Sequence, residues 1–96
     1  MTQRVRLTPR AVADLKAIAR YTTQKWGHAQ CQSYLRSLDA RFSWLAEHPT
    51  TGRARNDVAD RSRSFRHNAH IVFYRIRDNG IDVLAVVHSA MDVDGV

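Results

Sequence analysis

The sequence predicts an α+β fold, in which a hairpin of two helices packs on a mainly antiparallel four-stranded sheet in the order β-α-α-β-β-β. Two observations lead to this prediction. Two long amphipathic segments meet at Gly27, and two β-prone segments meet at Asn79-Gly80. Helices joined at a single glycine have to fold back on each other as an antiparallel pair. Asn-Gly between β-prone segments is the strongest short-range signal for a two-residue hairpin turn.

The N-terminal half is predicted to contain one short strand and two helices. Residues 3–7 alternate in the manner of a strand. Thr8-Pro9 predicts a helix start, because threonine is a good N-cap and proline suits the first helical position. Gly27 ends this helix, and a second runs from about 28 to 48, where Pro49 ends it. The two apolar stripes are Ala11, Leu15, Ile18, Ala19, Thr22 and Trp26, followed by Cys31, Tyr34, Leu35, Leu38, Phe42, Leu45 and Ala46.

The C-terminal half is predicted to form most of the sheet. Residues 49–61 are predicted as an irregular loop, and strands follow at about 62–67, 70–77 and 81–88. A type I′ turn at Asn79-Gly80 fixes a register, which an ion pair between Arg77 and Asp82 supports. The other pairs are Ile81 with Asp78, Leu84 with Arg75, Val86 with Phe73, and His88 with Ile71. The expected core is Leu15, Ile18, Leu35, Leu38, Phe42, Leu45, Val72, Ile76 and Val83.

Residues 1–96 are predicted to form a single domain. No apolar run approaches the roughly 20 residues of a membrane-spanning helix, and residues 1–7 lack the apolar core of a signal peptide. With one cysteine, Cys31, a disulfide within the chain is impossible, so the cytoplasm is the expected compartment. Cys31 lies on an apolar stripe, so we interpret it as a buried apolar residue rather than a nucleophile.

The charge of the chain suggests an acidic partner. Lysine and arginine number 15 against 9 acidic residues, a net charge of +6. Such an excess can serve solubility alone, or it can attract nucleic acid or an acidic protein segment. No helix–turn–helix or other DNA-reading element is visible, so no specific DNA binding by the chain alone is expected. Five arginines cluster within 14 residues: Arg53, Arg55, Arg61, Arg63 and Arg66.

The predicted hairpin carries apolar residues on both faces. One face suits contact with the helices: Val72, Tyr74, Ile76, Val83, Ala85 and Val87. The opposite face holds Ile71, Phe73, Leu84 and Val86 together with Arg75 and Arg77. A solvated face should not hold four contiguous apolar residues. The loop 49–61, the C-terminal tail or a partner has to cover them, and we favour a partner with partial cover by the chain itself. Trp44 lies off the main stripe of its helix and faces either solvent or a partner.

Histidine is the residue type with the best potential for acid–base chemistry. The predicted register surrounds His88 with Ile71, Phe73 and Val86, which cannot stabilise the negative charge that builds during phosphate cleavage. His67 and His70 flank a turn at Asn68-Ala69, and no further ligand pair stands at a recognisable spacing. We therefore expect neither a metal nor another cofactor.

An ordered set of short motifs runs along nearly the whole chain. The motifs are Leu7-Thr8-Pro9-Arg10-Ala11, Asp14-Leu15, Tyr21, Trp26-Gly27, Tyr34-Leu35, His48-Pro49, Gly52-Arg53, Phe65-Arg66, Val72-Phe73-Tyr74-Arg75, Val87-His88 and Met91-Asp92. Together they resemble the ParE toxins of the RelE/ParE superfamily. The resemblance implies one half of a bacterial toxin–antitoxin pair: an inhibitor of DNA gyrase without known chemistry, neutralised by an acidic ParD-like antitoxin that folds on the toxin.

The same superfamily implies an alternative activity. RelE-like members are ribosome-dependent messenger-RNA endonucleases, which use basic residues and a C-terminal tyrosine or histidine. Their third strand often contains Arg-Leu-Val-Tyr, where the arginine contributes to cleavage. Here the corresponding segment is Ile71-Val72-Phe73-Tyr74, so isoleucine replaces that arginine.

Three sets of residues are candidates, for nuclease catalysis, for binding the cellular target and for binding the antitoxin. No catalytic residue is expected, and a nuclease would have to use His88, Arg61, Arg63 and Arg66. The candidates for binding the cellular target are Arg61, Arg63, Arg66 and Arg75. The candidates for binding the antitoxin are Phe73, Arg75, Trp44 and Leu84. We expect the antitoxin segment to run along the groove of the helical hairpin and to reach the sheet near Arg75 and Phe73, with Phe73 as an apolar anchor.

Overall fold

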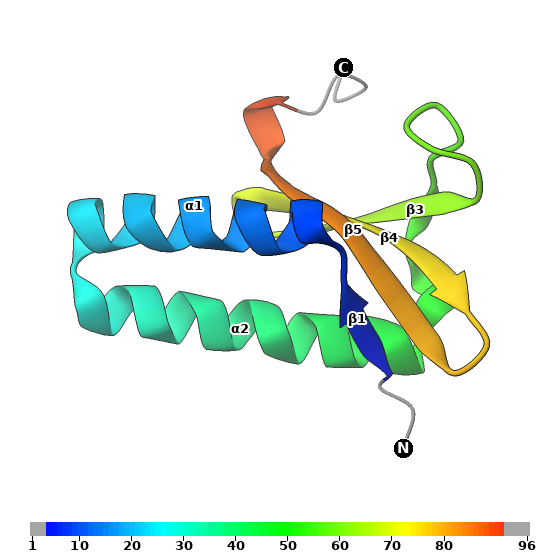
Figure 1. Cartoon of the computed structure of the whole chain (residues 1–96), viewed down its shortest axis with the longest axis horizontal. Helices are drawn as coiled ribbons and strands as arrows, with labels where there is room; N and C mark the ends of the chain where they lie inside the picture. The colour runs from blue at the N-terminus through cyan, green and yellow to red at the C-terminus, as the bar shows by residue number, and fades with distance from the viewer. Residues whose placement is uncertain (1–3, 92–96) are drawn as a thin grey trace.

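The computed structural model describes residues 4–91, which form two helices packed on one sheet (Figure 1). The α+β architecture is confirmed, but the described sheet has five strands rather than four, in the order β1-β5-β4-β3-β2. β1 pairs with β5 in parallel, and the other neighbours are antiparallel. The elements are β1 (Val5–Leu7), α1 (Pro9–Trp26), α2 (His28–Glu47), β2 (Arg53–Ala54), β3 (Ser62–His67), β4 (His70–Arg77) and β5 (Gly80–His88), with 3-10 turns at Pro49–Thr51 and Ser89–Met91.

The helical hairpin forms as its sequence signals predict. Thr8 caps α1, because its hydroxyl accepts a hydrogen bond from the Ala11 amide at 3.1 Å. Gly27 adopts a φ of +93°, and its amide bonds to the Thr23 carbonyl at 2.9 Å, so the chain can reverse there. Figure 1 shows the two helices running antiparallel on one face of the sheet. Trp26 was expected on the buried stripe, but at the end of α1 it is 64% exposed.

The predicted register of the β4–β5 hairpin is wrong. The turn residues are Asp78-Asn79, and Arg77 pairs with Gly80. The register follows from the approach of the chain at β1. The Arg4 carbonyl, just before β1, accepts a hydrogen bond from the Ile81 amide at 2.8 Å, and a side chain at Gly80 would collide with this carbonyl. Gly80 therefore allows the first strand to approach closely and is not a central residue of the turn.

A bulge shifts the register again further along the hairpin. Tyr74 pairs with Val83 and Phe73 with Ala85, so Leu84 is an extra residue in β5. The bulge reverses the side-chain alternation of β5 beyond that point. Val86 therefore joins the core beneath the helices, whereas Ala85 and Val87 lie on the opposite face, contrary to the prediction.

Most of the predicted core is confirmed. Leu38, Phe42 and Leu45 of α2 are buried together with Ile18, Val72 and Val83, and Leu15 and Leu35 pack against this cluster. Ile76 is the exception, since 39% of it is exposed. It lies next to the β4–β5 turn and lines a hollow with Ala46 and Pro49 that is open to solvent.

Two parts of the predicted organisation lie outside the described residues: Gln3 of the first strand and the tail from Asp92 onwards. Within residues 4–91, no helix is both long enough and apolar enough to cross a membrane. The loop predicted at 49–61 contains the short strand β2, in which Arg53 pairs with Ser64 and Ala54 with Arg63.

Candidate functional site

The far face of the sheet, which is turned away from the helices, is covered in part by the chain itself. Arg55 in the loop after β2 is only 1% exposed, and its guanidinium lies 5.0 Å from the ring centroid of Phe73. It also bonds to Asp57 at 3.1 Å and to the Ser64 hydroxyl at 3.3 Å. Phe73 is therefore 5% exposed, which corrects the expectation that a partner covers this side chain.

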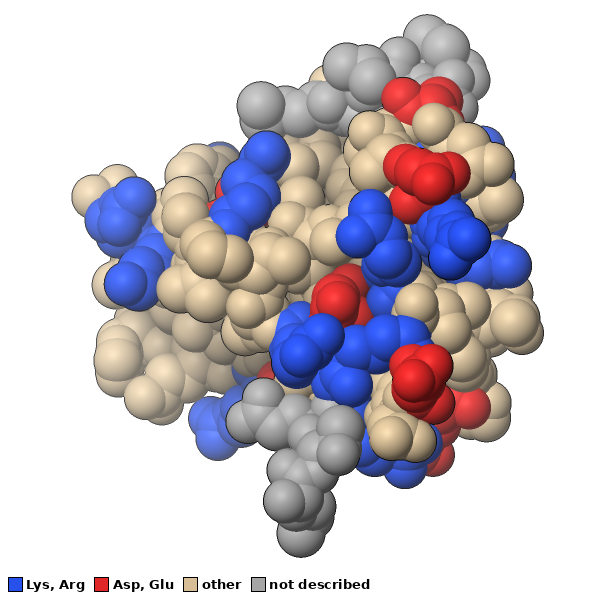
Figure 2. Space-filling view, turned by 45° about the vertical axis from the view of Figure 1, so that its right-hand side comes forward, with Lys and Arg blue, Asp and Glu red and all other residues tan. Residues whose placement is uncertain are grey.

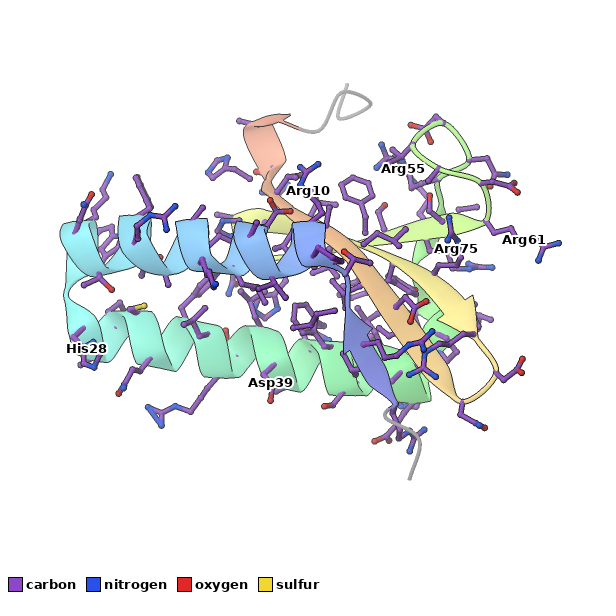
Figure 3. All side chains as sticks on the ribbon, viewed as in Figure 1. Arg10, His28, Asp39, Arg55, Arg61 and Arg75 are labelled. Carbon is purple, nitrogen blue, oxygen red and sulfur yellow. The ribbon has the colours of Figure 1, made fainter. Side chains whose placement is uncertain are left out.

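The arginines that cluster in the sequence are separated in the structure. Arg63 donates to the Gly52 carbonyl at 2.6 Å and to the Thr50 carbonyl at 3.3 Å, so it holds the segment after α2 against β3. Arg66 is exposed and bonds to the Asn68 carbonyl at 3.0 Å. Arg61 is exposed at a φ of +61°, and Figure 3 shows it pointing away from the sheet.

The remaining target candidate, Arg75, is half-buried and bonds to the Asp60 carbonyl at 3.2 Å. Figure 2 shows that lysine and arginine side chains gather on this side of the molecule, with carboxylates among them. Asp82 of β5 bonds to both Arg6 and Arg77 at 3.0 Å. The predicted ion pair between Arg77 and Asp82 thus exists, although the residue directly opposite Asp82 is Arg75.

The four antitoxin candidates do not form one surface. Trp44 is half-buried on the helix side of the sheet, with its ring 5.4 Å from that of Phe65 and the Arg41 guanidinium 4.8 Å above it. Phe73 and Arg75 belong to the far face. Leu84 is half-buried at the bulge.

An apolar groove lies between α1, α2 and β1, on the helical hairpin along which the antitoxin segment was expected to run. We call it the helical groove, and its volume is about 450 Å³. Leu7 and Val12 are 41% and 37% exposed at this groove. Its lining residues are Val5, Leu7, Val12, Leu15, Lys16, Ala19, Leu35, Leu38, Asp39 and Phe42. In the sequence, Val12 is an apolar residue outside the predicted stripe of α1. This position could have indicated that the helix has apolar side chains on a second side.

Three histidines lie in a row across the sheet, because His67 pairs with His70 and His70 pairs with His88. The prediction that Ile71 lies opposite His88 is therefore wrong. The Tyr34 hydroxyl and Nδ1 of His70 share a hydrogen bond at 2.6 Å, and the Ser37 hydroxyl lies 3.0 Å from Nε2 of His67. Burial lowers the pKa of both His67 and His70, and the positive charge of neighbouring groups lowers it further.

The structure does not bring the four residues of the hypothetical nuclease together. His88 lies in the histidine row, whereas Arg63 is four residues along β3 from His67, about 13 Å at the rise of a strand. Arg66 projects to the opposite face from His67, because neighbouring side chains alternate along a strand. No group of three potential metal ligands with suitable geometry occurs within residues 4–91.

We expect acidification to destabilise the fold through His67 and His70. Their pKa values are lowered from the ordinary 6.5, so below that pH the unfolded chain binds protons more readily than the folded chain. The free energy of unfolding should therefore fall as the pH decreases through 6.5. Urea unfolding at about pH 7.5 and about pH 5.5 measures the effect, and a His67→Gln/His70→Gln variant should lose most of it. An unchanged pH dependence in this variant would contradict the assignment.

Asp57 and Asp82 do not contribute to the change in stability between these two pH values. Hydrogen bonds from Arg55 and Arg6 lower the pKa values of these carboxyl groups below 3.8.

The fold defines the chain as a small α+β protein in which a helical hairpin covers an antiparallel sheet. A family model described as "ParE toxin of type II toxin-antitoxin system, parDE" matches residues 5–93. The chain is 38% identical over 95 residues to Toxin ParE1 of Mycobacterium tuberculosis, and the alignment covers 98% of this chain and 97% of that protein. It is 36% identical over 87 residues to Toxin ParE1 of Caulobacter vibrioides, covering 91% and 90% of the two chains.

A solved structure shows the same fold. It is described as "Chromosomal ParDE TA system from P. aeruginosa", and the match has a TM-score of 0.75 at 17% identity, over 90% of this chain and 95% of that one. The chain belongs to the ParE toxin family of type II toxin–antitoxin systems. The resemblance that the sequence motifs suggested is confirmed.

Proposed function

We propose that this toxin inhibits DNA gyrase by binding it, without catalysing a reaction, and that a ParD-like antitoxin neutralises it. Membership of the ParE family is the observation on which this proposal mainly rests. ParE-like members of the superfamily are described as gyrase inhibitors, as the sequence resemblance implied. Such an inhibitor acts in the cytoplasm, which is the compartment expected from the sequence.

The separation of the nuclease candidates supports a binding function over RNA cleavage. Phosphate cleavage needs a proton-transfer group and positive charge at the same reacting phosphate. Here Arg63 is held by the carbonyls of the 49–52 segment, and Arg61 points away from the sheet (Figure 3). Within residues 4–91, His88 lies beside His70 at hollows that Arg10 and Lys25 line, and none of the candidate arginines Arg61, Arg63 and Arg66 lines them.

The helical groove is the surface that best fits an antitoxin. It is lined mainly by apolar side chains, and Leu7 and Val12 remain partly exposed in it. An acidic segment with apolar anchors would bury these side chains and complement the +6 charge of the chain. The structural neighbour is itself described as a ParDE system, which is consistent with a ParD-like partner. Phe73 can contribute only if the partner displaces Arg55, so we place the main apolar contacts in the groove and a charged contact at Arg75.

Two assays run in parallel test the proposed function. The purified protein is added to a gyrase supercoiling reaction and to translating ribosomes, each with and without the antitoxin. We expect inhibition of supercoiling that the antitoxin relieves, and intact messenger RNA on the ribosomes. Ribosome-dependent cleavage of messenger RNA with normal supercoiling would establish the alternative, a RelE-like endonuclease.

Replacement of His88 by alanine should leave growth inhibition largely intact, because the proposed mechanism requires no proton transfer. The measurement is the growth of cells that express wild type or the variant at equal levels. Circular dichroism and antitoxin binding serve as controls for folding. A folded, antitoxin-binding variant that no longer inhibits growth would contradict the non-catalytic mechanism.

Charge reversal at the exposed arginines should weaken binding to the cellular target. We propose Arg61, Arg66 and Arg75 as contacts, with Arg63 contributing through the segment that it holds. An Arg61→Glu/Arg66→Glu variant should inhibit supercoiling less well, and the difference should shrink at high salt because exposed charges are screened. Arg20→Glu/Arg36→Glu, on the exposed surfaces of the helices, is the charge-matched control. Equal inhibition by both double variants would remove Arg61 and Arg66 from the target surface.

A further inference from the structure

A second hollow lies on the other flank of α1 from the helical groove, where the end of this helix meets the ends of β4 and β5. We call it the tip hollow, and its volume is about 270 Å³. A neighbouring hollow of about 460 Å³ along α1 shares Tyr21, His70 and His88 with it. The tip hollow is lined by Tyr21, Thr22, Lys25, Trp26, Gln30, Tyr34, Ala69, His70 and His88.

The mouth of the tip hollow carries two exposed aromatic side chains with a cation between them. Trp26 is 64% exposed and Tyr21 is 59% exposed, although both have large apolar rings that gain free energy from burial. Nζ of Lys25 donates a hydrogen bond to the Tyr21 hydroxyl at 3.2 Å and lies 5.8 Å from the ring centroid of Trp26, so the face of the Tyr21 ring stays open. Exposed flat rings beside a flexible positive charge are the components on which unpaired bases stack and to which their phosphates bind.

The side of the tip hollow formed by β4 and β5 supplies a hydrogen-bond donor. Nδ1 of His88 accepts a hydrogen bond from the Ala90 amide at 3.1 Å, so the neutral ring carries its proton on Nε2. His88 can therefore donate to a phosphate or base oxygen without being charged. His70 lies beside His88, with the two ring centroids 5.7 Å apart. Nδ1 of His70 shares a hydrogen bond with the Tyr34 hydroxyl.

Negative charge around the two hollows is already compensated. Among their lining residues, the carboxylate is that of Asp14. It accepts hydrogen bonds from Arg10 at 3.0 Å and from the Val86 amide at 2.9 Å. An anionic ligand thus meets Lys25 and neutral donors rather than an unpaired carboxylate.

We propose that the tip hollow binds single-stranded nucleic acid, with unpaired bases stacked on Trp26 and Tyr21 and the adjoining phosphates held by Lys25 and His88. This binding goes beyond gyrase inhibition and does not depend on it. In a duplex the base faces are already covered by stacking on the neighbouring base pairs, so the site selects single strands. A peptide with apolar anchors fits the helical groove better, because that groove is lined mainly by aliphatic side chains.

The test measures binding of labelled single strands of about 12 nucleotides, oligo(U) and oligo(dT), by fluorescence anisotropy, with a duplex of equal length for comparison. We expect either or both single strands to bind more tightly than the duplex and to quench tryptophan fluorescence, with no quenching in Trp26→Ala, where Trp44 is the remaining tryptophan. Trp26→Ala should weaken binding about tenfold or more, as expected for the loss of one stacking contact. Lys25→Gln should reduce the slope of log K against log salt by about 0.7. Because both side chains are exposed, these variants should keep the wild-type melting temperature.

Arg20→Gln is the matched control, because it removes one exposed positive charge from the same helix outside the hollow. It should change the affinity by less than about twofold. The absence of single-strand binding at low salt would overturn the proposal, as would equal losses in Trp26→Ala and Arg20→Gln. Quenching of Trp26 by an acidic peptide but not by either oligonucleotide would also overturn it and would identify the hollow as a protein-docking site.

Discussion

Replacing Leu38 by alanine is expected to lower the free energy of unfolding by about 2–5 kcal/mol. Leu38 is 1% exposed and lies on α2 in the cluster that joins both helices to β4 and β5. The substitution removes buried methyl groups and leaves a cavity that neighbouring side chains can fill only in part. Urea unfolding followed by circular dichroism measures the loss.

Leu7→Ala provides the comparison for Leu38→Ala, because the same atoms are removed from a side chain that is 41% exposed. Its cost should be clearly smaller, since less apolar surface leaves the solvent when Leu7 folds. Equal losses at the two positions would contradict the packing of the helical hairpin on the sheet.

Replacing Gly80 by alanine should destabilise the fold by more than about 3 kcal/mol, because the added methyl group must displace backbone rather than a flexible side chain and the φ of +157° adds a conformational cost. The methyl group would overlap the carbonyl of Arg4, to which the Ile81 amide bonds. β1 would have to move away from β5, or Gly80 would have to change its conformation. The unfolding free energy of the variant gives the size of the effect.

Gly27→Ala separates the steric cost at Gly80 from the conformational cost of losing a glycine. Gly27 has a φ of +93°, but an added methyl group would meet nothing within 4 Å. Its ψ of 169° places it in a backbone region that favours glycine, so this variant should carry only the conformational cost, about 1–3 kcal/mol, and should be less destabilising than Gly80→Ala. If it were as destabilising as Gly80→Ala, close approach of the first strand would not explain the glycine at position 80.

The helices could be predicted from the sequence because their signals are local. Thr8-Pro9, Gly27 and Pro49 mark helix ends through the conformations of a few residues, and the apolar stripes report the buried sides. The register of the β4–β5 hairpin could not be predicted in the same way. It depends on the parallel strand β1, which reaches Gly80 from the other end of the chain, and on a bulge at Leu84 that leaves no clear mark in the sequence.

The candidate sites were predicted less well than the fold, since they depend on which side chains share a surface. Arg55 and Arg63 belong to the basic cluster in the sequence, but one is buried over Phe73 and the other holds the 49–52 segment. Charge counting cannot distinguish these structural arginines from the exposed Arg61. Trp26 was assigned to the core by its spacing, but the helix ends there and none of the elements in residues 4–91 covers it.

Inhibition of gyrase by binding alone can be measured by titrating the purified toxin into a supercoiling reaction at fixed gyrase concentration. A binding inhibitor should reach full effect at a toxin-to-gyrase ratio set by the number of toxin-binding sites on gyrase. Once the toxin has bound, the degree of inhibition should not change with time, and added antitoxin should restore supercoiling. Full supercoiling at saturating toxin would contradict the account. So would inhibition that grows with time at far fewer toxin molecules than gyrase molecules and that antitoxin cannot reverse, because such behaviour requires catalytic turnover.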